Sequence, residues 1–246
     1  MIAILSPAKK IRTGQATEWI GRPQFLKEAQ QVIEALRPFA AWELERILMT
    51  NPEIALDAYV QYRSFDASLP GREAVFAYNG LVYQQMNATD FSDEELAYAN
   101  AHLRILSAVY GILRPLDGIL PCRLELQCKL PVGNAKNLYD FWGDKPYRTL
   151  FFGRRTVINL ASEEYARVIR RQLLPSDDFI DIVFLAHYKG ALKTLPAWAK
   201  MARGQMARFM VKERANTPED LKQFDWNGYC YVPELSYHNK FVYVKD

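Results

Sequence analysis

The chain has 246 residues and a net charge of only +3; 50% of it is hydrophobic and 13% is aromatic. This apolar content excludes a disordered chain, and the small charge permits a polyanionic partner without requiring one. No apolar run reaches the ~18 residues of a membrane span, so we expect no membrane association. Three cysteines without framework spacing predict a reducing, cytoplasmic setting and no disulfides.

A basic loop follows the first predicted strand, which spans residues 2–5. Ser6-Pro7 ends the strand, and Lys9 and Lys10 come directly after. Such a loop is a common anion site, because backbone N–H groups and cations converge there. Ser6, Lys9 and Lys10 are therefore candidate binding residues, and a solvated surface loop is the alternative.

Three helices with a structural role are predicted next, over residues 23–36, 42–48 and 52–65. Residues 73–78 have the β-branched and aromatic content of a strand, and the turn pair Asn79-Gly80 closes it. A short helix or loop then carries Tyr83.

The central stretch begins with a capping box, in which Ser92 is the cap and Glu95 follows three residues later. The helix is expected to run through Ser107 to Tyr110 and Gly111, where a glycine can take positive φ. A helix, a glycine turn and a second helical stretch outline a helix-hairpin-helix, which holds nucleic-acid phosphate at backbone N–H groups. A plain helical hairpin in the core is the alternative.

A buried strand is predicted at residues 156–160, and Ser162 begins the helix that follows it. Strand-loop-helix transitions place polar residues where ligands bind in α/β proteins. Asn159 and Ser162 are therefore candidate ligand-binding residues, with simple capping as the alternative. The aromatic residues within 139–142 are assigned to the core rather than to base stacking.

The last third is predicted to contain a strand at residues 179–188, a neighbour that begins near Leu192, and a terminal hairpin of residues 228–232 and 241–244. A long helix from Pro196 to about Ala215 carries five basic residues and one acid, among them Lys200, Arg203 and Arg208, and is the best electrostatic candidate for phosphate contact. We predict a single α+β domain over residues 1–246, with a central mixed β-sheet, surrounding helices and the helix-hairpin-helix-like element.

Cofactor and metal chemistry is not indicated. The three histidines are scattered, no second cysteine pair completes a zinc site, and no Walker loop or dinucleotide fingerprint occurs. We therefore predict neither metal nor cofactor. The catalytic residues are unknown; Lys9, Asp117, Glu125 and Asp140 are candidates if they meet in a cleft, and a structural salt-bridge network explains them equally.

Six ordered segments resemble the YaaA family of peroxide stress resistance proteins. They are SPAK (residues 6–9), YNGLVY (78–83), LRILSAVYGILRPLDGILPCRLE (103–125), NLYDFWGD (137–144), INLASEEY (158–165) and ARGQMARF (202–209). The chain departs from the family pattern at Cys122, where relatives tend to have an aromatic residue, and at Gln127, where they tend to have glycine. A stacking aromatic at that place is therefore in doubt.

The resemblance implies a cytoplasmic protein that binds duplex DNA largely without sequence preference. It also implies protection during peroxide stress, with less oxidative damage linked to unincorporated iron. We expect a monomer. The residues expected to contact DNA are Lys9, Lys10, Arg104, Tyr110, Gly111, Arg114, Arg123, Lys200, Arg203 and Arg208.

A second hypothesis is an enzyme that acts on a nucleotide, a damaged base or a small phosphorylated ligand at a cleft centred on Lys9. A lysine beside a carboxylate is similar to the site of base-excision glycosylases, which share the helix-hairpin-helix. This likeness is an analogy of fold, so whether the protein is an enzyme stays open.

Overall fold

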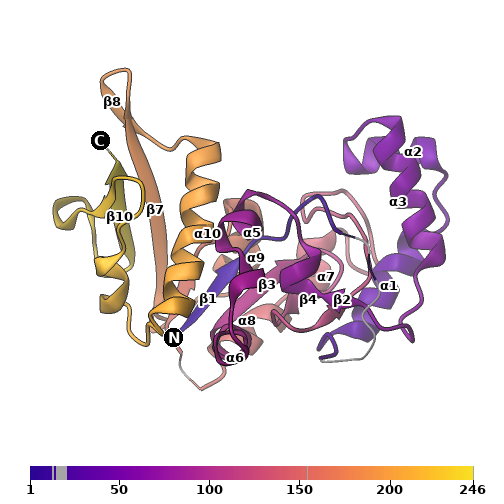
Figure 1. The fold of residues 1–246 in the computed structure, drawn as a ribbon. Coiled ribbons are helices and arrows are strands. Elements are labelled where there is room, and N and C mark those ends of the chain that lie inside the picture. Colours follow the sequence, from indigo (N-terminus) through magenta and orange to yellow (C-terminus); the bar gives the residue numbers. More distant parts are fainter. Residues whose placement is uncertain (13, 15–20, 154, 246) are drawn as a thin grey trace.

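A mixed β-sheet lies at the centre of the protein in the computed structural model, which describes residues 1–12, 14, 21–153 and 155–245 (Figure 1). Its strands in spatial order are β4 (Gly111–Leu113), β3 (Leu103–Ser107), β1 (Ile2–Leu5), β6 (Val157–Asn159), β7 (Phe179–Tyr188), β10 (Lys240–Lys245) and β9 (Tyr229–Tyr231). A further strand, β8 (Ala191–Lys193), pairs with β7. β2 (Arg72–Glu73) and β5 (Gly118–Ile119) form a separate pair.

The middle of the sheet is parallel and its margins are antiparallel. β3, β1, β6, β7 and β10 run in one direction, whereas β4, β8 and β9 run against their neighbours. β1 is buried along its whole length, as expected for a strand with a parallel neighbour on each side. The predicted α+β fold with a mixed sheet is confirmed.

Helices cover this sheet and extend beyond it. They are α1 (Leu26–Leu36), α2 (Ala41–Leu48), α3 (Pro52–Ser64), α4 (Ala74–Ala77), α5 (Leu81–Met86), α6 (Asp93–His102), α7 (Leu138–Trp142), α8 (Lys145–Phe151), α9 (Glu163–Arg170) and α10 (Pro196–Lys212). Short 3₁₀ turns lie at η1 (Ala88–Asp90), η2 (Glu219–Gln223) and η3 (Pro233–Leu235). In Figure 1, α2 and α3 stand at the opposite side of the molecule from β7 and β10.

Local signals located several elements correctly. Ser92 and Glu95 form the predicted capping box at the start of α6. The strand predicted at residues 179–188 is β7, and the terminal hairpin is the antiparallel pair of β9 and β10. The three cysteines are free, as expected.

The strand predicted at residues 73–78 is wrong. Only Glu73 belongs to a strand, and α4 begins at Ala74. The backbone N–H groups of Ala74 and Val75 donate to the carbonyl groups of Asp117 and Pro115, so a neighbouring loop binds the start of this short helix. Tertiary hydrogen bonds therefore override the local strand propensity.

The predicted helix-hairpin-helix does not form in the central stretch. The helix ends at His102, and the apolar residues that follow it form β3, which turns into the antiparallel strand β4. Gly111 takes a φ of +69°, and a Cβ there would lie 2.5 Å from the ring of Trp142. A β-hairpin packed on that ring therefore occupies the place of the expected motif.

A second glycine brings α10 against α5. A Cβ on Gly204 would lie 2.2 Å from the carbonyl oxygen of Val82, so only glycine permits this close crossing. Arg203, which directly precedes Gly204, and Lys200, one turn earlier on α10, are thereby held beside the loops that follow the central strands.

Candidate functional site

A cavity of about 530 Å³ lies at the carboxyl ends of the parallel strands β1, β3 and β6. Ser6 follows β1, Ser107 ends β3, and Ser162 follows β6, and all three line the cavity. Ligands of open α/β sheets bind at this edge. We call the space the Lys9 cavity. Its polar and charged lining includes Ser6, Lys9, Lys10, Tyr83, Ser107, Arg123, Glu125, Ser162, Glu164, Lys200 and Arg203.

Glu125 is the central carboxylate of the Lys9 cavity. Its side chain is only 8% exposed, and its Oε1 lies 2.9 Å from Nζ of Lys9 and 3.2 Å from a terminal nitrogen of Arg123. Lys9 itself is 65% exposed, so it covers the buried carboxylate from the solvent side. The structure thus brings two of the predicted catalytic candidates, Lys9 and Glu125, into direct contact.

A second carboxylate, Glu164, lies in the same cavity at the start of α9. Burial raises the pKa of Glu164, and the charge of Glu125 raises it further, while the N–H group of Gln127 opposes the shift.

Cys122 also lines the cavity, and burial raises its pKa far above the ordinary thiol value. This cysteine therefore stays protonated and is a poor nucleophile.

Ser6 joins the end of β1 to the beginning of α9. Its Oγ accepts a hydrogen bond from the N–H group of Ser162 at 2.8 Å and donates to the hydroxyl of Ser162 at 3.1 Å. The hydroxyl of Tyr83 donates to the carbonyl oxygen of Ser6 at 2.8 Å. Ser162 occupies the cap position of α9, but its side chain does not cap the helix and instead contacts Ser6.

The side chain of Asn159 forms hydrogen bonds within the protein. Its amide nitrogen donates to Asp181 at 2.8 Å, and its amide oxygen accepts from the N–H group of Ala161 at 2.9 Å. Both polar ends of this side chain are therefore engaged by other residues of the protein.

Two guanidinium groups in the Lys9 cavity carry a buried nitrogen without a partner. Nε of Arg123 and Nε of Arg203 have no hydrogen-bond acceptor within the described part of the chain. Burial also lowers the pKa of Arg203. An unpaired buried donor costs about 1–3 kcal/mol, so these two N–H groups are an unusual feature of a folded protein.

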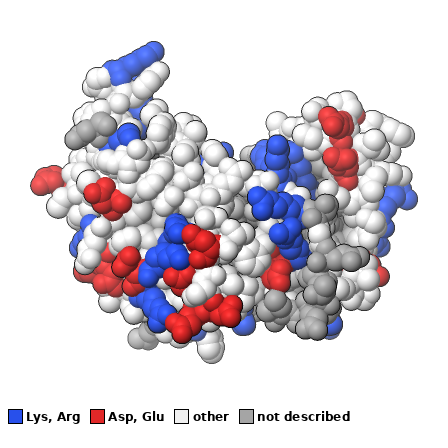
Figure 2. Space-filling view, viewed as in Figure 1, with Lys and Arg blue, Asp and Glu red and all other residues white. Residues whose placement is uncertain are grey.

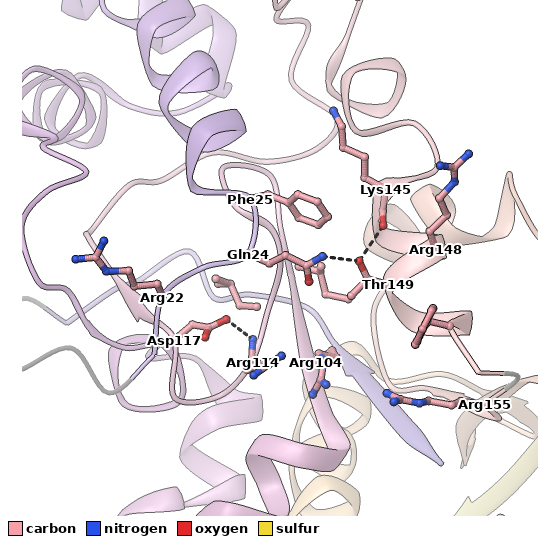
Figure 3. Close-up of a pocket in the computed structure, with 13 residues that line it drawn as sticks. Arg22, Gln24, Phe25, Arg104, Arg114, Asp117, Lys145, Arg148, Thr149 and Arg155 are labelled. Atoms are coloured by element: carbon pink, nitrogen blue, oxygen red, sulfur yellow. Dashed lines mark hydrogen bonds between the residues drawn. The ribbon is translucent and has the colours of Figure 1, made fainter.

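A second cavity, of about 750 Å³, lies at the opposite end of β3, where Arg104 projects from the strand (Figure 3). Of the described residues that line it, six are basic and Asp117 is the acid. We call it the arginine groove; its basic residues are Arg22, Arg104, Arg114, Lys145, Arg148 and Arg155. Figure 3 shows that they come from both sides of the cavity.

Arg104 is held by the end of α6. Its guanidinium donates to the carbonyl oxygens of Asn100 at 3.0 Å and Leu103 at 2.7 Å. Burial, together with the positive charges of Arg114 and Arg155, lowers the pKa of Arg104 to about 10. The groove therefore concentrates cations that repel one another.

Asp117 balances only part of this charge. Its Oδ2 accepts from the N–H group of Arg114 at 2.8 Å, and burial raises its pKa although the neighbouring arginines act in the opposite direction. Outside the groove, Asp144 pairs with Arg148 at 2.7 Å and Glu28 lies 3.9 Å from Lys145.

The residues expected to contact DNA are divided between different places. Five line the Lys9 cavity and two line the arginine groove, so they do not form one cleft. Tyr110 and Gly111 are buried in the core, which removes the phosphate contact predicted for them. Arg208 pairs with both carboxylate oxygens of Asp90. Asp140, one of the predicted catalytic candidates, pairs with Arg171 at 3.1 Å and does not line the Lys9 cavity.

The charged surface has two different parts in the face shown in Figure 2. Basic side chains gather beside the hollow between α10 and the pair of α2 and α3. Acidic and basic side chains interleave over α6 and the end of α10, where Lys212 bridges Glu95 at 2.7 Å and Arg214 bridges Glu94. The cationic side of α10 is therefore largely neutralised toward its end.

Several site residues carried no recognisable sequence signal. Arg22 and Arg155 stand in segments without a motif, and Lys145 and Arg148 lie just after the NLYDFWGD segment. Glu164 lies within the INLASEEY segment, where the sequence indicates only the start of a helix.

Within the described ranges, no group of three or more histidine, cysteine, aspartate or glutamate side chains is arranged to hold a metal ion. No helix among the described residues is both long and apolar enough to cross a membrane.

Comparison with known proteins gives matches along nearly the whole chain. The sequence model of a family described as peroxide stress protein YaaA matches residues 1–235. The chain is 38% identical to a UPF0246 protein of Agathobacter rectalis, over 100% of this chain and 99% of that protein. It is 39% identical to a UPF0246 protein of Lacticaseibacillus casei over 98% of each, and 33% identical to one of Clostridioides difficile over 100% of each.

Proposed function

The chain belongs to the peroxide stress protein YaaA family, and from this premise we propose that it binds duplex DNA through the arginine groove during peroxide stress. The observation that carries the proposal is the charge of the groove. Six basic side chains line it among the residues that the structure describes, whereas the carboxylate of Asp117 already accepts a backbone hydrogen bond from Arg114. Cations gathered in this way attract the phosphate backbone and release its condensed counterions.

The size of the groove supports contact with the backbone rather than with bases. A cavity of about 750 Å³ cannot enclose a duplex, but it can receive phosphate groups at its mouth. Phosphate contacts carry no direct sequence information, so the binding is largely independent of sequence. In this proposal the protein acts in the cytoplasm as a monomer and covers DNA, which limits the oxidative damage linked to unincorporated iron.

A labelled duplex of about 20 base pairs, titrated by fluorescence anisotropy, tests the proposal. We expect the double charge reversal Arg148→Glu and Arg155→Glu to weaken binding at least about tenfold, because both residues are basic and line the groove. Lys193→Glu, on the exposed strand β8, is the matched control and is expected to leave the affinity nearly unchanged. Equal loss in the control, or no loss in the double variant, would remove the groove from the proposal.

A second candidate function is supported by the contact between Lys9 and Glu125, with Glu164 in the same cavity. A lysine and two carboxylates, one of them with a raised pKa, are groups that can transfer protons. The candidate is an enzyme that acts on a nucleotide, a damaged base or a small phosphorylated ligand. Lys9→Ala would then abolish turnover of such substrates and leave duplex affinity unchanged; unchanged turnover would exclude a catalytic Lys9.

A further inference from the structure

We infer that the Lys9 cavity binds the phosphate group of a small phosphorylated molecule, with Arg123 and Arg203 as its principal contacts. This inference does not rest on DNA binding, because the arginine groove lies at the other end of β3. It also holds whether or not a reaction follows binding.

The first support is the pair of unsatisfied donors. Nε of Arg123 and Nε of Arg203 are both buried without an acceptor in the described part of the chain, and both residues line this one cavity. They come from distant segments, the loop after β5 and the helix α10, so their convergence is a property of the fold. A bound anion with several acceptor oxygens would offer hydrogen-bond acceptors to both guanidinium groups.

The second support is that Arg203 has no counter-ion of its own in the part of the chain that the structure describes. The acid that acts on its pKa is Asp181, and Asp181 already accepts from Arg170 at 2.6 Å and from Asn159 at 2.8 Å. No ion pair among the described residues involves Arg203, although burial destabilises its positive charge. A partly buried cation without a partner is destabilising, and a bound anion would offset part of that cost.

The third support is the charge balance of the cavity. Of the described residues that line it, five are basic and two, Glu125 and Glu164, are acidic. Glu125 is already neutralised by Lys9 and Arg123, so the cavity keeps an excess of positive charge. A phosphate monoester, which carries up to two negative charges and three acceptor oxygens, matches this excess better than a single carboxylate does.

The size of the cavity indicates what the phosphate is attached to. About 530 Å³ fits a small molecule, and Tyr78 and Tyr83, whose ring centroids lie 5.3 Å apart, line it. Both rings are nearly buried, so each contributes only a small apolar surface to the cavity. Lys200 is exposed on α10 and stands at the cavity with Arg203.

Isothermal titration calorimetry on the full chain tests the inference with adenosine 5′-monophosphate, inorganic phosphate, citrate and adenosine. We expect adenosine 5′-monophosphate to bind with a Kd below about 1 mM and adenosine to bind at least tenfold more weakly. Inorganic phosphate should bind in the same cavity. If the nucleotide binds more tightly than inorganic phosphate, its nucleoside part occupies the rest of the cavity. Adenosine binding as tightly as the nucleotide, or citrate binding more tightly than both phosphates, would overturn the inference.

Variants locate the bound phosphate. Arg203→Met and Arg123→Met are each expected to weaken the nucleotide at least tenfold, while Arg148→Ala, in the arginine groove, leaves its affinity unchanged. Should the arginine variants fail to fold, the exposed Lys200→Ala carries the test, with an expected loss of about threefold or more. Unchanged affinity in the folded variants of the Lys9 cavity, or an equal loss in Arg148→Ala, would contradict the assignment.

Discussion

Nζ of Lys9 lies 2.9 Å from Oε1 of Glu125, although the two residues come from loops at opposite ends of a long stretch of chain. The exposed Lys9 and the mostly buried Arg123 share one carboxylate oxygen of Glu125. Because Glu125 is buried, its charge depends on these two partners, whereas Lys9 keeps most of its hydration. The pair is therefore asymmetric, and its two members should respond differently to substitution.

The free energy of unfolding is expected to show this asymmetry. Lys9→Ala should lower it by less than about 1 kcal/mol, because the lysine is largely exposed and Arg123 still neutralises Glu125. Glu125→Ala should lower it by about 2–4 kcal/mol, because Arg123 then loses its acid. Urea unfolding measures both values, with Lys10→Ala as the control. Equal losses for Lys9→Ala and Glu125→Ala would contradict a carboxylate held mainly by burial and Arg123.

Gly111 should be far less tolerant of substitution than Gly133. Both have positive φ, +69° and +56°, but a Cβ on Gly111 would lie 2.5 Å from Trp142, whereas a Cβ on Gly133 meets nothing within 4 Å. Gly133→Ala should therefore cost about 1–2 kcal/mol from backbone strain alone. Gly111→Ala should cost about 3 kcal/mol or more, because overpacking is added. Thermal and urea unfolding of the two variants provide the comparison, and similar losses would show that the hairpin does not pack on Trp142.

The pH dependence of stability should have opposite signs at Glu164 and Asp66. Burial raises the pKa of Glu164 above its ordinary value of 4.5, so its ionised form is less favourable in the folded protein than in the unfolded chain. The contribution of Glu164 to the free energy of unfolding is therefore present below pH 4.5 and is lost as the pH rises through the folded pKa. Glu164→Gln should therefore stabilise the protein at pH 7, and the gain should shrink toward pH 4.

Asp66 provides the control for that experiment. Hydrogen bonds from the side chain and backbone of Ser68 lower the pKa of Asp66 below 3.8. Its contribution is present above that value and is lost as the pH falls through the folded pKa. Asp66→Asn should destabilise the protein at pH 7, with a difference that narrows in acid. Urea titrations at pH 4, 5.5 and 7 separate the two cases; the same sign for both variants would contradict the environments described here.

Arg208 should be dispensable for duplex binding. Both of its terminal nitrogens donate to Asp90, at 2.6 and 2.7 Å, so the guanidinium is already occupied. Arg208→Ala is expected to change the duplex Kd less than about twofold and to lower stability by about 1 kcal/mol. Anisotropy and urea unfolding measure the two effects. A tenfold loss of affinity would mean that Arg208 leaves Asp90 and contacts DNA.

The sequence predicted elements whose signals are local. Ser92 and Glu95 specify the start of α6 within four residues, and the long apolar run of β7 has no helical rhythm. Residues 103–107 lack such a signal, because their apolar positions fit either one face of a helix or a strand buried on both faces. Pairing with β1 and β4 decides between these structures, and that pairing is a long-range property.

The candidate site was predictable only in part, for the same reason. Lys9 and Glu125 stand in segments that resemble a known family, so the sequence identifies them as candidates, whereas only the fold reveals their contact. Arg155 and Glu164 gain their roles from the neighbours that the fold provides, which single-sequence patterns do not reveal. The residues expected to contact DNA do not share one cavity, because β3 carries Arg104 at one end and Ser107 at the other.

The salt dependence of duplex affinity is the most direct test of binding through the arginine groove. The logarithm of the binding constant should fall linearly with the logarithm of salt concentration between about 50 and 200 mM, with a slope of about −0.9 for each phosphate neutralised. Removing two groove cations, as Arg148→Ala with Arg155→Ala, should make this slope shallower by about 1.8, while Lys193→Ala leaves it unchanged. An identical slope in the double variant and the unsubstituted protein, or no binding at 50 mM salt, would contradict the account.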